Sequence, residues 1–154
     1  MRREVVMEIY LEDNGCDVED YINAVAAVLV LDQYEGDLRI ELKTKCDADA
    51  GGYCYGDEDD IDIEIATHVQ GEALDIDTIK VNIAHEMVHA QQIASGRLKD
   101  HGIKIIDDRL VKVAEWDGEY HTNTKYDDQP WEIDAYGREA QVAQEAKEML
   151  AQWM

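Results

Sequence analysis

The stretch that decides the fold is IAHEMVHAQQ, residues 83–92, in which two histidines stand four positions apart and a glutamate follows the first. In a helix, positions i and i+4 share a face one turn apart, so His85 and His89 can direct their imidazoles at a single ion. Glu86 lies about 100° further around the helix, where its carboxylate can reach a water at the ion rather than the ion itself. The spacing therefore predicts a zinc site with its own general base.

A catalytic zinc normally has three protein ligands and one open position, so a further ligand must come from elsewhere in the chain. An extended motif is excluded, because positions 92 and 95 are Gln92 and Ser95 rather than glycine and histidine. Two candidates remain, His101 and Glu132. Glu132 is favoured because it stands in the first turn of a helix predicted to begin near Pro130, where the helix dipole and free amide hydrogens stabilise a carboxylate.

Two other polar residues follow on the same predicted helix. Tyr136 lies one turn after Glu132, so its hydroxyl is a candidate donor to the oxyanion of a tetrahedral intermediate, with a packed tyrosine as the alternative. Asp134 is expected to face away from Glu132 and to compensate the charge of the helix N-terminus. Glu86 and Tyr136 are thus the candidate catalytic residues, and His85, His89 and Glu132 the candidate metal ligands.

The segments HEMVHAQQIASGRL and EWDGEYHTNTKYDDQPWEIDAYGREA resemble the small zincin-type metallopeptidases that phages often encode. The PWEIDA part is similar to the E-x-E-A segment of minimal gluzincins, including the ImmA/IrrE-type proteins, whose first glutamate is the third zinc ligand; this implies Glu132 here. Asp134 replaces the second acid of that segment. The resemblance covers residues 76–145 and implies a zincin-like fold that hydrolyses peptide bonds through a metal-activated water.

A neighbouring family favours the other ligand. SprT-type metallopeptidases also contain an HEM-x-H motif, and their third ligand is a histidine in an H-G-x-x-aromatic segment. The corresponding stretch here is HGIKI, in which Ile105 replaces the aromatic residue and His101 follows His89 too closely. That family acts on DNA-bound proteins, which fits poorly with a net charge of −22. The resemblance to this family is therefore the weaker one.

Hydrophobic patterning predicts a single α+β domain over residues 1–154. The N-terminal half is expected to contain a strand, a buried helix capped by Asp17, and two half-buried strands joined by a hairpin-like loop. These elements are placed at residues 4–11, 18–34, 38–45 and 60–67. By analogy with zincins, the strand at 61–66 is expected to present an edge to which an extended peptide substrate adds.

The C-terminal half is expected to begin with the motif helix, capped by Asp75 or Asp77 and ending near Gly96. The pair Asp117-Gly118 is a turn signal between two short strands and predicts a hairpin. The last helix is expected to run from about Trp131 to near the end. Its apolar side chains are predicted to pack on the core: Ala135, Val142, Ala146, Met149, Leu150 and Trp153.

The charge of the chain limits its partners. It has 36 acidic and 14 basic side chains, which argues against direct binding to nucleic acid or anionic lipid. A heavily solvated surface is the preferred explanation of this charge, and attraction of a basic peptide or protein substrate and mimicry of nucleic acid are the alternatives. Glu4 and Glu8 interrupt any export signal, and the longest apolar run, residues 24–31, is too short to span a bilayer. The sequence thus predicts a cytoplasmic protein without membrane contact. A non-catalytic zinc protein and an acidic mimic of nucleic acid remain the alternative functions.

Two weaker patterns lie in the N-terminal half. Residues 47–58 place Asp47, Asp49, Gly52 and Glu58 at positions 1, 3, 6 and 12 of a calcium loop, although a mobile acidic hairpin tip is the alternative. Three cysteines are present, and reduced thiols are expected, with a Cys46–Cys54 bridge as the alternative and Cys16 unpaired.

Overall fold

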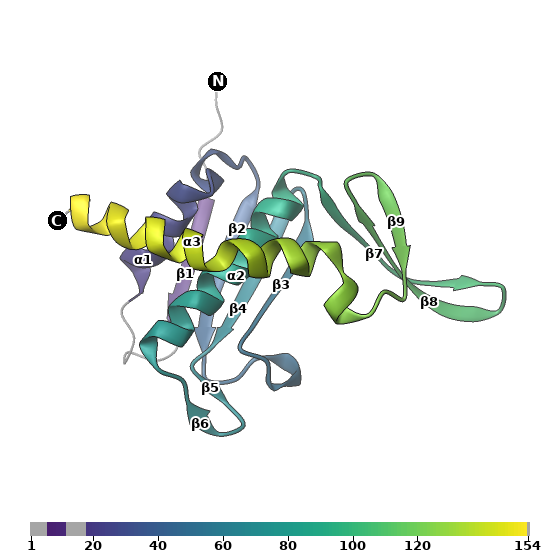
Figure 1. Cartoon of the computed structure of the whole chain (residues 1–154), viewed down its shortest axis with the longest axis horizontal. Coiled ribbons are helices and arrows are strands. Elements are labelled where there is room, and N and C mark those ends of the chain that lie inside the picture. Colours follow the sequence, from purple (N-terminus) through teal and green to yellow (C-terminus); the bar gives the residue numbers. More distant parts are fainter. Residues whose placement is uncertain (1–5, 12–17, 154) are drawn as a thin grey trace.

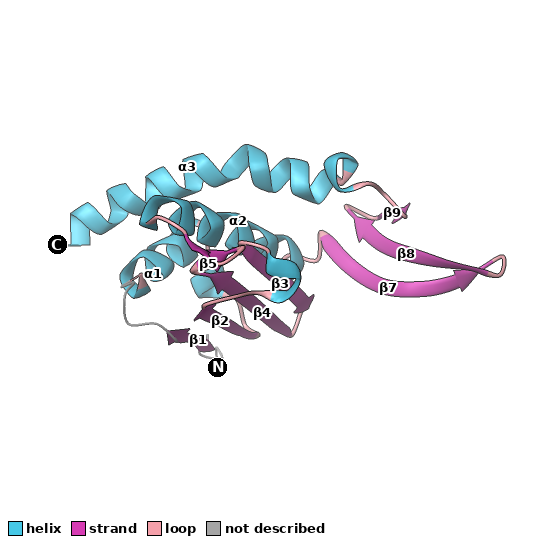
Figure 2. Cartoon of the chain, turned by 90° about the horizontal axis from the view of Figure 1, so that it is seen from below, coloured by secondary structure: helices cyan, strands magenta, loops and turns pink. Residues whose placement is uncertain are grey.

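The computed structural model describes residues 6–11 and 18–153, and within them it shows a mixed α+β fold of three α-helices and several small sheets. The helices gather over one face of the main sheet, and a long hairpin projects from one end of the molecule (Figure 1, Figure 2). The predicted α+β class is therefore confirmed. Residues 4 and 5, Cys16 and Asp17, for which predictions were made, lie outside the described residues.

Four strands form the main sheet in the spatial order β1-β2-β4-β3. Their bounds are Val6–Leu11 for β1, Asp37–Lys43 for β2, Gly52–Asp57 for β3 and Asp60–Ala66 for β4. The first three in this order run parallel, and β3 runs antiparallel to β4 at the edge. The inward side chains of the two central strands pair in register: Leu38 with Ile61, Ile40 with Ile63, and Leu42 with Ile65.

The sequence prediction was wrong about how the central strands connect. The stretch between them is not a hairpin-like loop, because β2 and β4 are parallel neighbours and the stretch contains a short 3-10 turn (Asp47–Asp49) and the whole of β3. The strand at 61–66 does not present an edge either, since β4 is paired on both sides. The edge on the side of the motif helix belongs to β3.

Helix α1 (Glu19–Val28) is buried, as predicted, but it is shorter than the predicted helix at 18–34. It begins after Val18, which makes no side-chain cap. It ends because Val30 adopts a left-handed conformation with φ 59°, after which Leu31–Gln33 form one 3-10 turn.

Helix α2 (Ile76–Ala94) carries the histidine motif. Asp75 is its N-cap, since its carboxylate accepts a hydrogen bond of 2.8 Å from the backbone N–H of Thr78. The helix ends before Gly96, whose φ of +79° suits a glycine at that position. A short hairpin precedes it, and its strands, β5 (His68–Val69) and β6 (Glu72–Ala73), have two residues each. The predicted start and end of this helix are confirmed.

The projecting hairpin belongs to a second sheet, in the order β7-β8-β9. Its strands are β7 (Leu98–Ile106), β8 (Arg109–Trp116) and β9 (Glu119–Thr122). The predicted Asp117-Gly118 turn joins β8 to β9, and both residues have positive φ. Strand β7 was not predicted, and the hairpin that it forms with β8 is the longer of the two.

Helix α3 (Pro130–Trp153) begins at the predicted proline and crosses both other helices (Figure 2). Ala135, Val142 and Ala146 are buried, and Met149 and Leu150 pack against the core at its margin. The prediction for Trp153 was wrong, because its side chain is 55% exposed. No helix in the described residues is both long and apolar enough to cross a membrane.

Candidate metal centre

The three predicted metal ligands meet where the first turn of α3 lies across the middle of α2. The Nε2 atoms of His85 and His89 each lie 2.9 Å from the same oxygen, Oε1 of Glu132. The ligand atoms of the three residues all lie within 4.8 Å of one another, and among the described residues this is the group of His, Cys, Asp and Glu that could hold a metal ion. Both histidines are buried, and Glu132 is largely so.

The pKa values in this group reflect how closely the charges are packed. Burial alone would raise the pKa of Glu132, but the hydrogen bonds from His85 and His89 and their charge lower it to about 2. Burial lowers the pKa of each histidine, but the carboxylate of Glu132 and its neighbours outweigh burial and raise both values. The Glu132 carboxylate is therefore ionised at neutral pH, and it favours the protonated form of both imidazoles. A cation that binds here displaces protons, so its affinity rises with pH.

The second nitrogen of each imidazole has its own acceptor. His85 donates from Nδ1 to Oε2 of Glu139 at 2.7 Å, and His89 donates from Nδ1 to Oε1 of Gln92 at 2.8 Å. Holding the proton on Nδ1 leaves the lone pair of a neutral imidazole on Nε2, the nitrogen that faces Glu132. In metal-binding histidines, the ring nitrogen that does not bind the metal usually donates such a hydrogen bond, which fixes the orientation of the ring. The residues present therefore fit a divalent metal ion.

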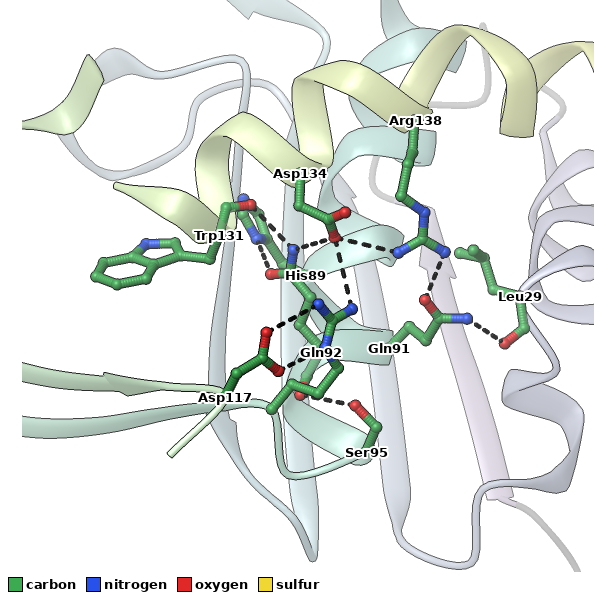
Figure 3. A network of polar contacts seen from close by, with 10 residues as sticks. Leu29, His89, Gln91, Gln92, Ser95, Asp117, Trp131, Asp134 and Arg138 are labelled. Atoms are coloured by element: carbon green, nitrogen blue, oxygen red, sulfur yellow. Dashed lines mark hydrogen bonds and ion pairs between the residues drawn. The ribbon is translucent and has the colours of Figure 1, made fainter. Parts of the chain in front are cut away.

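The acceptor of His89 is itself held by a polar network that joins α2 to α3 (Figure 3). Gln92 is fully buried, and its Nε2 donates to the backbone oxygen of Trp131 and to Oδ2 of Asp134, both at 2.9 Å. Asp134 also accepts from Arg138 at 3.2 Å. Asp134 faces away from the metal group, as predicted, but its role differs from the expected charge compensation. It fixes the amide of Gln92, which in turn orients His89.

The network continues outward on both sides. Arg138 donates to Oε1 of Gln91 at 2.6 Å, and Gln91 donates to the backbone oxygen of Leu29 at the end of α1 at 2.9 Å (Figure 3). On the other side, Arg97 lies 3.9 Å from Oδ2 of Asp134 and pairs with Asp117 of the β8–β9 turn at 2.9 Å. The position of His89 is thus tied to every helix and to the second sheet.

Glu86, the predicted base, lies beside the ligand group and not within it. It is 8% exposed and packs against β3, where a Cβ on Gly52 would come within 2.7 Å of its Cγ. A side chain at position 52 would therefore displace the carboxylate. Burial raises the pKa of Glu86, while the nearby charges of His89 and His85 act in the opposite direction. A raised pKa suits a group that must accept a proton and then release it near neutral pH.

A pocket of about 390 Å³ opens onto this centre. His85, His89, Glu132 and Glu86 all line it. Its other walls come from β3 and the residue two before it, from α2, from the β7–β8 hairpin and from residues around the start of α3: Ala50, Gly52, Tyr53, Cys54, Tyr55, Gly56, Ile93, Leu98, Asp100, Lys112, Ala114, Tyr126, Gln129 and Trp131. The ligand group is thus reached from a pocket and is not covered on all sides.

Tyr136 lies close to the centre, with its ring 4.5 Å from that of His85, but it is 54% exposed and does not line the pocket. Its hydroxyl is 2.8 Å from that of Tyr126, which does line the pocket. Burial, this hydrogen bond and the charge of Glu132 raise the pKa of Tyr126. The Tyr126 hydroxyl therefore keeps its proton at neutral pH and is a possible hydrogen-bond donor in the pocket.

The structure does not bring the alternative ligand to the centre. His101 lies on β7, where its Nε2 is 3.2 Å from Oε1 of Glu115 and its ring is tilted by 36° against that of Tyr120. His121 packs edge-on against Trp131, and His68 contacts the hydroxyl of its neighbour Thr67. None of these histidines belongs to the ligand group.

Of the two weaker patterns in the N-terminal half, the calcium loop is not formed, whereas the expectation of reduced thiols is confirmed for Cys46 and Cys54. Residues 47–58 form a 3-10 turn and a strand, and no set of their acids belongs to a ligand group in the described part of the chain. Asp49 instead accepts from the backbone of Gln70 at 2.8 Å. Cys46 and Cys54 are free thiols and form no bridge.

Sequence reasoning missed three residues of the site: Glu139, Gln92 and Tyr126. Glu139 stands seven residues after Glu132, two turns along the same face of the last helix. Gln92 stands three residues after His89, on the helix face that carries the two histidines. Helical periodicity could have identified both as partners of the ligands. Nothing in the local pattern around Tyr126 indicates its position.

Comparisons of the chain with protein-family models, with curated proteins and with solved structures found no match.

The third ligand can be tested by substitution. Replacing Glu132 with alanine removes the oxygen that both histidines contact, so we expect Glu132→Ala to weaken Zn²⁺ binding by more than about 100-fold. His101→Ala should leave binding unchanged, because His101 lies outside the group. Competition with a chromophoric chelator measures both. The opposite ranking of the two variants would contradict the assignment.

The role of Glu139 can be tested with a matched control on the same helix. Glu139→Ala removes the acceptor of His85 Nδ1 and should lower Zn²⁺ affinity by roughly 10- to 100-fold. Glu145→Ala removes an exposed carboxylate whose hydrogen bond is to Gln141, so it should bind Zn²⁺ like the wild type. Equal affinities of the two variants would show that Glu139 does not support the site.

Proposed function

We propose that the protein is a zinc-dependent metallopeptidase of the zincin type. The observation that carries the proposal is the convergence of His85, His89 and Glu132 on one point in a pocket that also contains the carboxylate of Glu86. Hydrolysis by a zinc site needs metal ligands and a general base. Here the ligands are two histidines on one helix and a glutamate from a later helix, and the base is adjacent to the first histidine.

The arrangement around the centre supports a zincin-like fold. The motif helix packs against a sheet whose edge strand, β3, is antiparallel to its neighbour and lines the pocket. The third ligand comes from a helix that lies across the motif helix, after an intervening hairpin. An extended chain can add to the free side of β3 as a further strand, which would lay its backbone along the pocket.

The ligand types favour zinc. Two imidazoles and one carboxylate are a common catalytic zinc set and leave a further coordination position open. When bound, the metal polarises the scissile carbonyl and acidifies a water. His85 and His89 would bind it through Nε2 and Glu132 through its carboxylate, each held in place by the hydrogen bonds described above.

Glu86 is the group that moves protons. Its carboxylate takes a proton from the attacking water as the water oxygen bonds to the carbonyl carbon, and it delivers that proton to the leaving nitrogen as the C–N bond breaks. Gly52 leaves room for the carboxylate beside the edge strand. Because burial favours the protonated form of Glu86, the proton is held between the two transfers.

The tyrosine pair is the candidate source of an oxyanion donor. Tyr136 was expected to serve directly, but Tyr126 is the one that lines the pocket. In this proposal Tyr126 donates to the developing oxyanion, and Tyr136 orients the Tyr126 hydroxyl through their mutual hydrogen bond.

Two alternatives are less well supported. A purely structural zinc site would be enclosed, whereas a pocket reaches all three ligands and Glu86. A mimic of nucleic acid would need a uniformly acidic face. On the open face of the main sheet, Arg39 pairs with Asp62 at 2.9 Å and Lys43 with Glu64 at 2.8 Å, so positive charges interrupt the acids there.

The base can be separated from the ligands by one substitution. Glu86→Gln keeps the shape of the side chain but cannot accept the proton, so we expect normal Zn²⁺ binding and a loss of peptide hydrolysis of at least about 100-fold. A broad library of fluorescence-quenched peptides provides the assay. Loss of zinc from this variant would make Glu86 a ligand instead. A wild-type protein that cleaves no peptide would favour the structural alternative.

The charge of the chain also makes a prediction about substrates. A net charge of −22 attracts basic peptides over a distance set by the ionic strength. We expect kcat/KM for Lys- and Arg-rich peptides to fall as NaCl is added, mainly through KM, and that of neutral peptides to change little. Rates that do not depend on salt would show that the charge serves solubility alone.

A further inference from the structure

The β7–β8 hairpin forms part of the pocket wall. It extends well away from the main sheet and the helices (Figure 1, Figure 2). Its outer half, here called the arm, consists of residues 103–112. Three of its large apolar side chains are among the most exposed in the described chain: Ile103 at 69%, Ile105 at 75% and Leu110 at 74%. None of them packs against the core. Exposed apolar side chains that gather on one element mark a surface that contacts a partner.

The register of the hairpin shows which way these side chains face. Residues directly opposite in an antiparallel pair point to the same face, and so does every second residue along a strand. Ile103 pairs with Lys112, and Ile105 pairs with Leu110. Lys112 and Ala114 alternate with Leu110 along β8, and both line the pocket. The three apolar side chains therefore share the face of the hairpin that forms the pocket wall.

A β-bulge makes this alignment possible. The pairing shifts between Asp100 and Gly102, so that His101 has no direct partner. The Gly102 φ is +72°, and its N–H donates to Oδ1 of Asp100 at 2.8 Å. If the strands paired regularly here, with His101 opposite Val113 and no bulge, Ile103 and Ile105 would lie on the face opposite to Asp100. The bulge thus places them on the same face as the pocket-lining part of β7.

The charge of the arm differs from that of the whole chain. The strands of the hairpin and their turn, residues 98–116, contain as many basic as acidic side chains, in a protein with a net charge of −22. The outer strands themselves, at 103–106 and 109–112, contain no acid but include Lys104, Arg109 and Lys112. The arm therefore offers apolar contact without the strong negative potential of the body, and its occupant need not be basic.

We propose that the pocket face of the arm binds an apolar segment of a polypeptide substrate, outside the pocket where the bond is cleaved. From Ala114 to Leu110 the face extends for about 13 Å, which corresponds to about four residues of extended substrate. The preferred substrate is then an unfolded or extended protein segment with apolar residues at a distance from the cleaved bond. The cleavage part of this inference rests on the proposed function, but the binding part does not.

The test uses binding, so that it does not depend on hydrolysis. The probe is fluorescein-labelled ribonuclease A that has been reduced and carboxamidomethylated, an unfolded basic polypeptide. Its binding to zinc-loaded Glu86→Gln protein is measured by anisotropy. Adding Ile105→Ser and Leu110→Ser should weaken binding roughly tenfold, because two exposed apolar contacts are lost.

The hairpin provides a matched control on its other face. Ile106 and Val111 point away from the pocket face, so Ile106→Ser with Val111→Ser removes two apolar side chains of the same hairpin. This pair should leave probe binding unchanged. Equal weakening by the two pairs, or no probe binding by the parent protein, would overturn the proposal.

If the arm bound a second copy of the chain or a lipid surface instead of a polypeptide substrate, other measurements would detect it. If the arm bound a second copy of the chain, Ile105→Ser with Leu110→Ser would change the mass measured by light scattering. If it bound lipid, the same pair would abolish sedimentation with phosphatidylcholine vesicles. Either result would overturn the proposal. A wild-type protein that cleaves no short peptide would defeat the proposed function alone, since the binding comparison would still decide the role of the arm.

Discussion

One oxygen atom, Oε1 of Glu132, is shared by the Nε2 atoms of two histidines that belong to a different helix. A buried carboxylate is costly unless it is paired, and here its partners are fixed one turn apart on α2. The position of α3 on α2 is therefore determined at its first turn. The polar network reinforces it, because Gln92 contacts both Trp131 and Asp134 of α3, and Glu139 contacts His85 two turns further along. The packing of apolar residues from Ala135 to Ala146 then follows from this alignment.

The same alignment decides what the pocket can do. Because His85 and His89 face α3, Glu86 is turned toward the sheet and meets the edge strand β3. A residue larger than glycine at position 52 would contact its carboxylate, so the close approach of the edge strand to Glu86 requires a glycine there. The ligands thus come from the contact of two helices and the base from the contact of a helix with a sheet edge. Neither contact alone would assemble the proposed hydrolytic centre.

Local patterns were sufficient for the parts of the fold that local interactions determine. The histidine spacing, the Asp75 cap, the Asp117-Gly118 turn and Pro130 at the start of α3 could be read from neighbouring residues. The choice of Glu132 over His101 also came from a local argument, the stabilisation of a carboxylate at a helix start. The structure brings Glu132 to the histidines and leaves His101 on the second sheet.

The errors arose where tertiary structure decides. Strand β3 has glycine at Gly52 and Gly56 and lies in an acidic stretch, so its alternation was too weak to be recognised. The order of strands in the sheet depends on long-range pairing, and for this reason β4 was mistaken for an edge. The helix at 18–34 was predicted too long because its apolar residues continue past Val30, where the chain turns by adopting a positive φ that valine seldom adopts.

The two kinds of attraction in this molecule act over different ranges. The charge of −22 acts at up to about a Debye length and attracts basic polypeptides whatever the order of their residues. The apolar face of the arm acts only in contact, and the bulge at His101 aligns it with the wall of the pocket. A substrate attracted by charge alone would be released as readily as it arrived, since exposed ion pairs contribute little. In the proposed function, contact along the arm would lengthen its stay and would select segments that are apolar beyond the cleaved bond, so that long-range charge would govern the encounter and the arm would add a second basis for the choice of substrate.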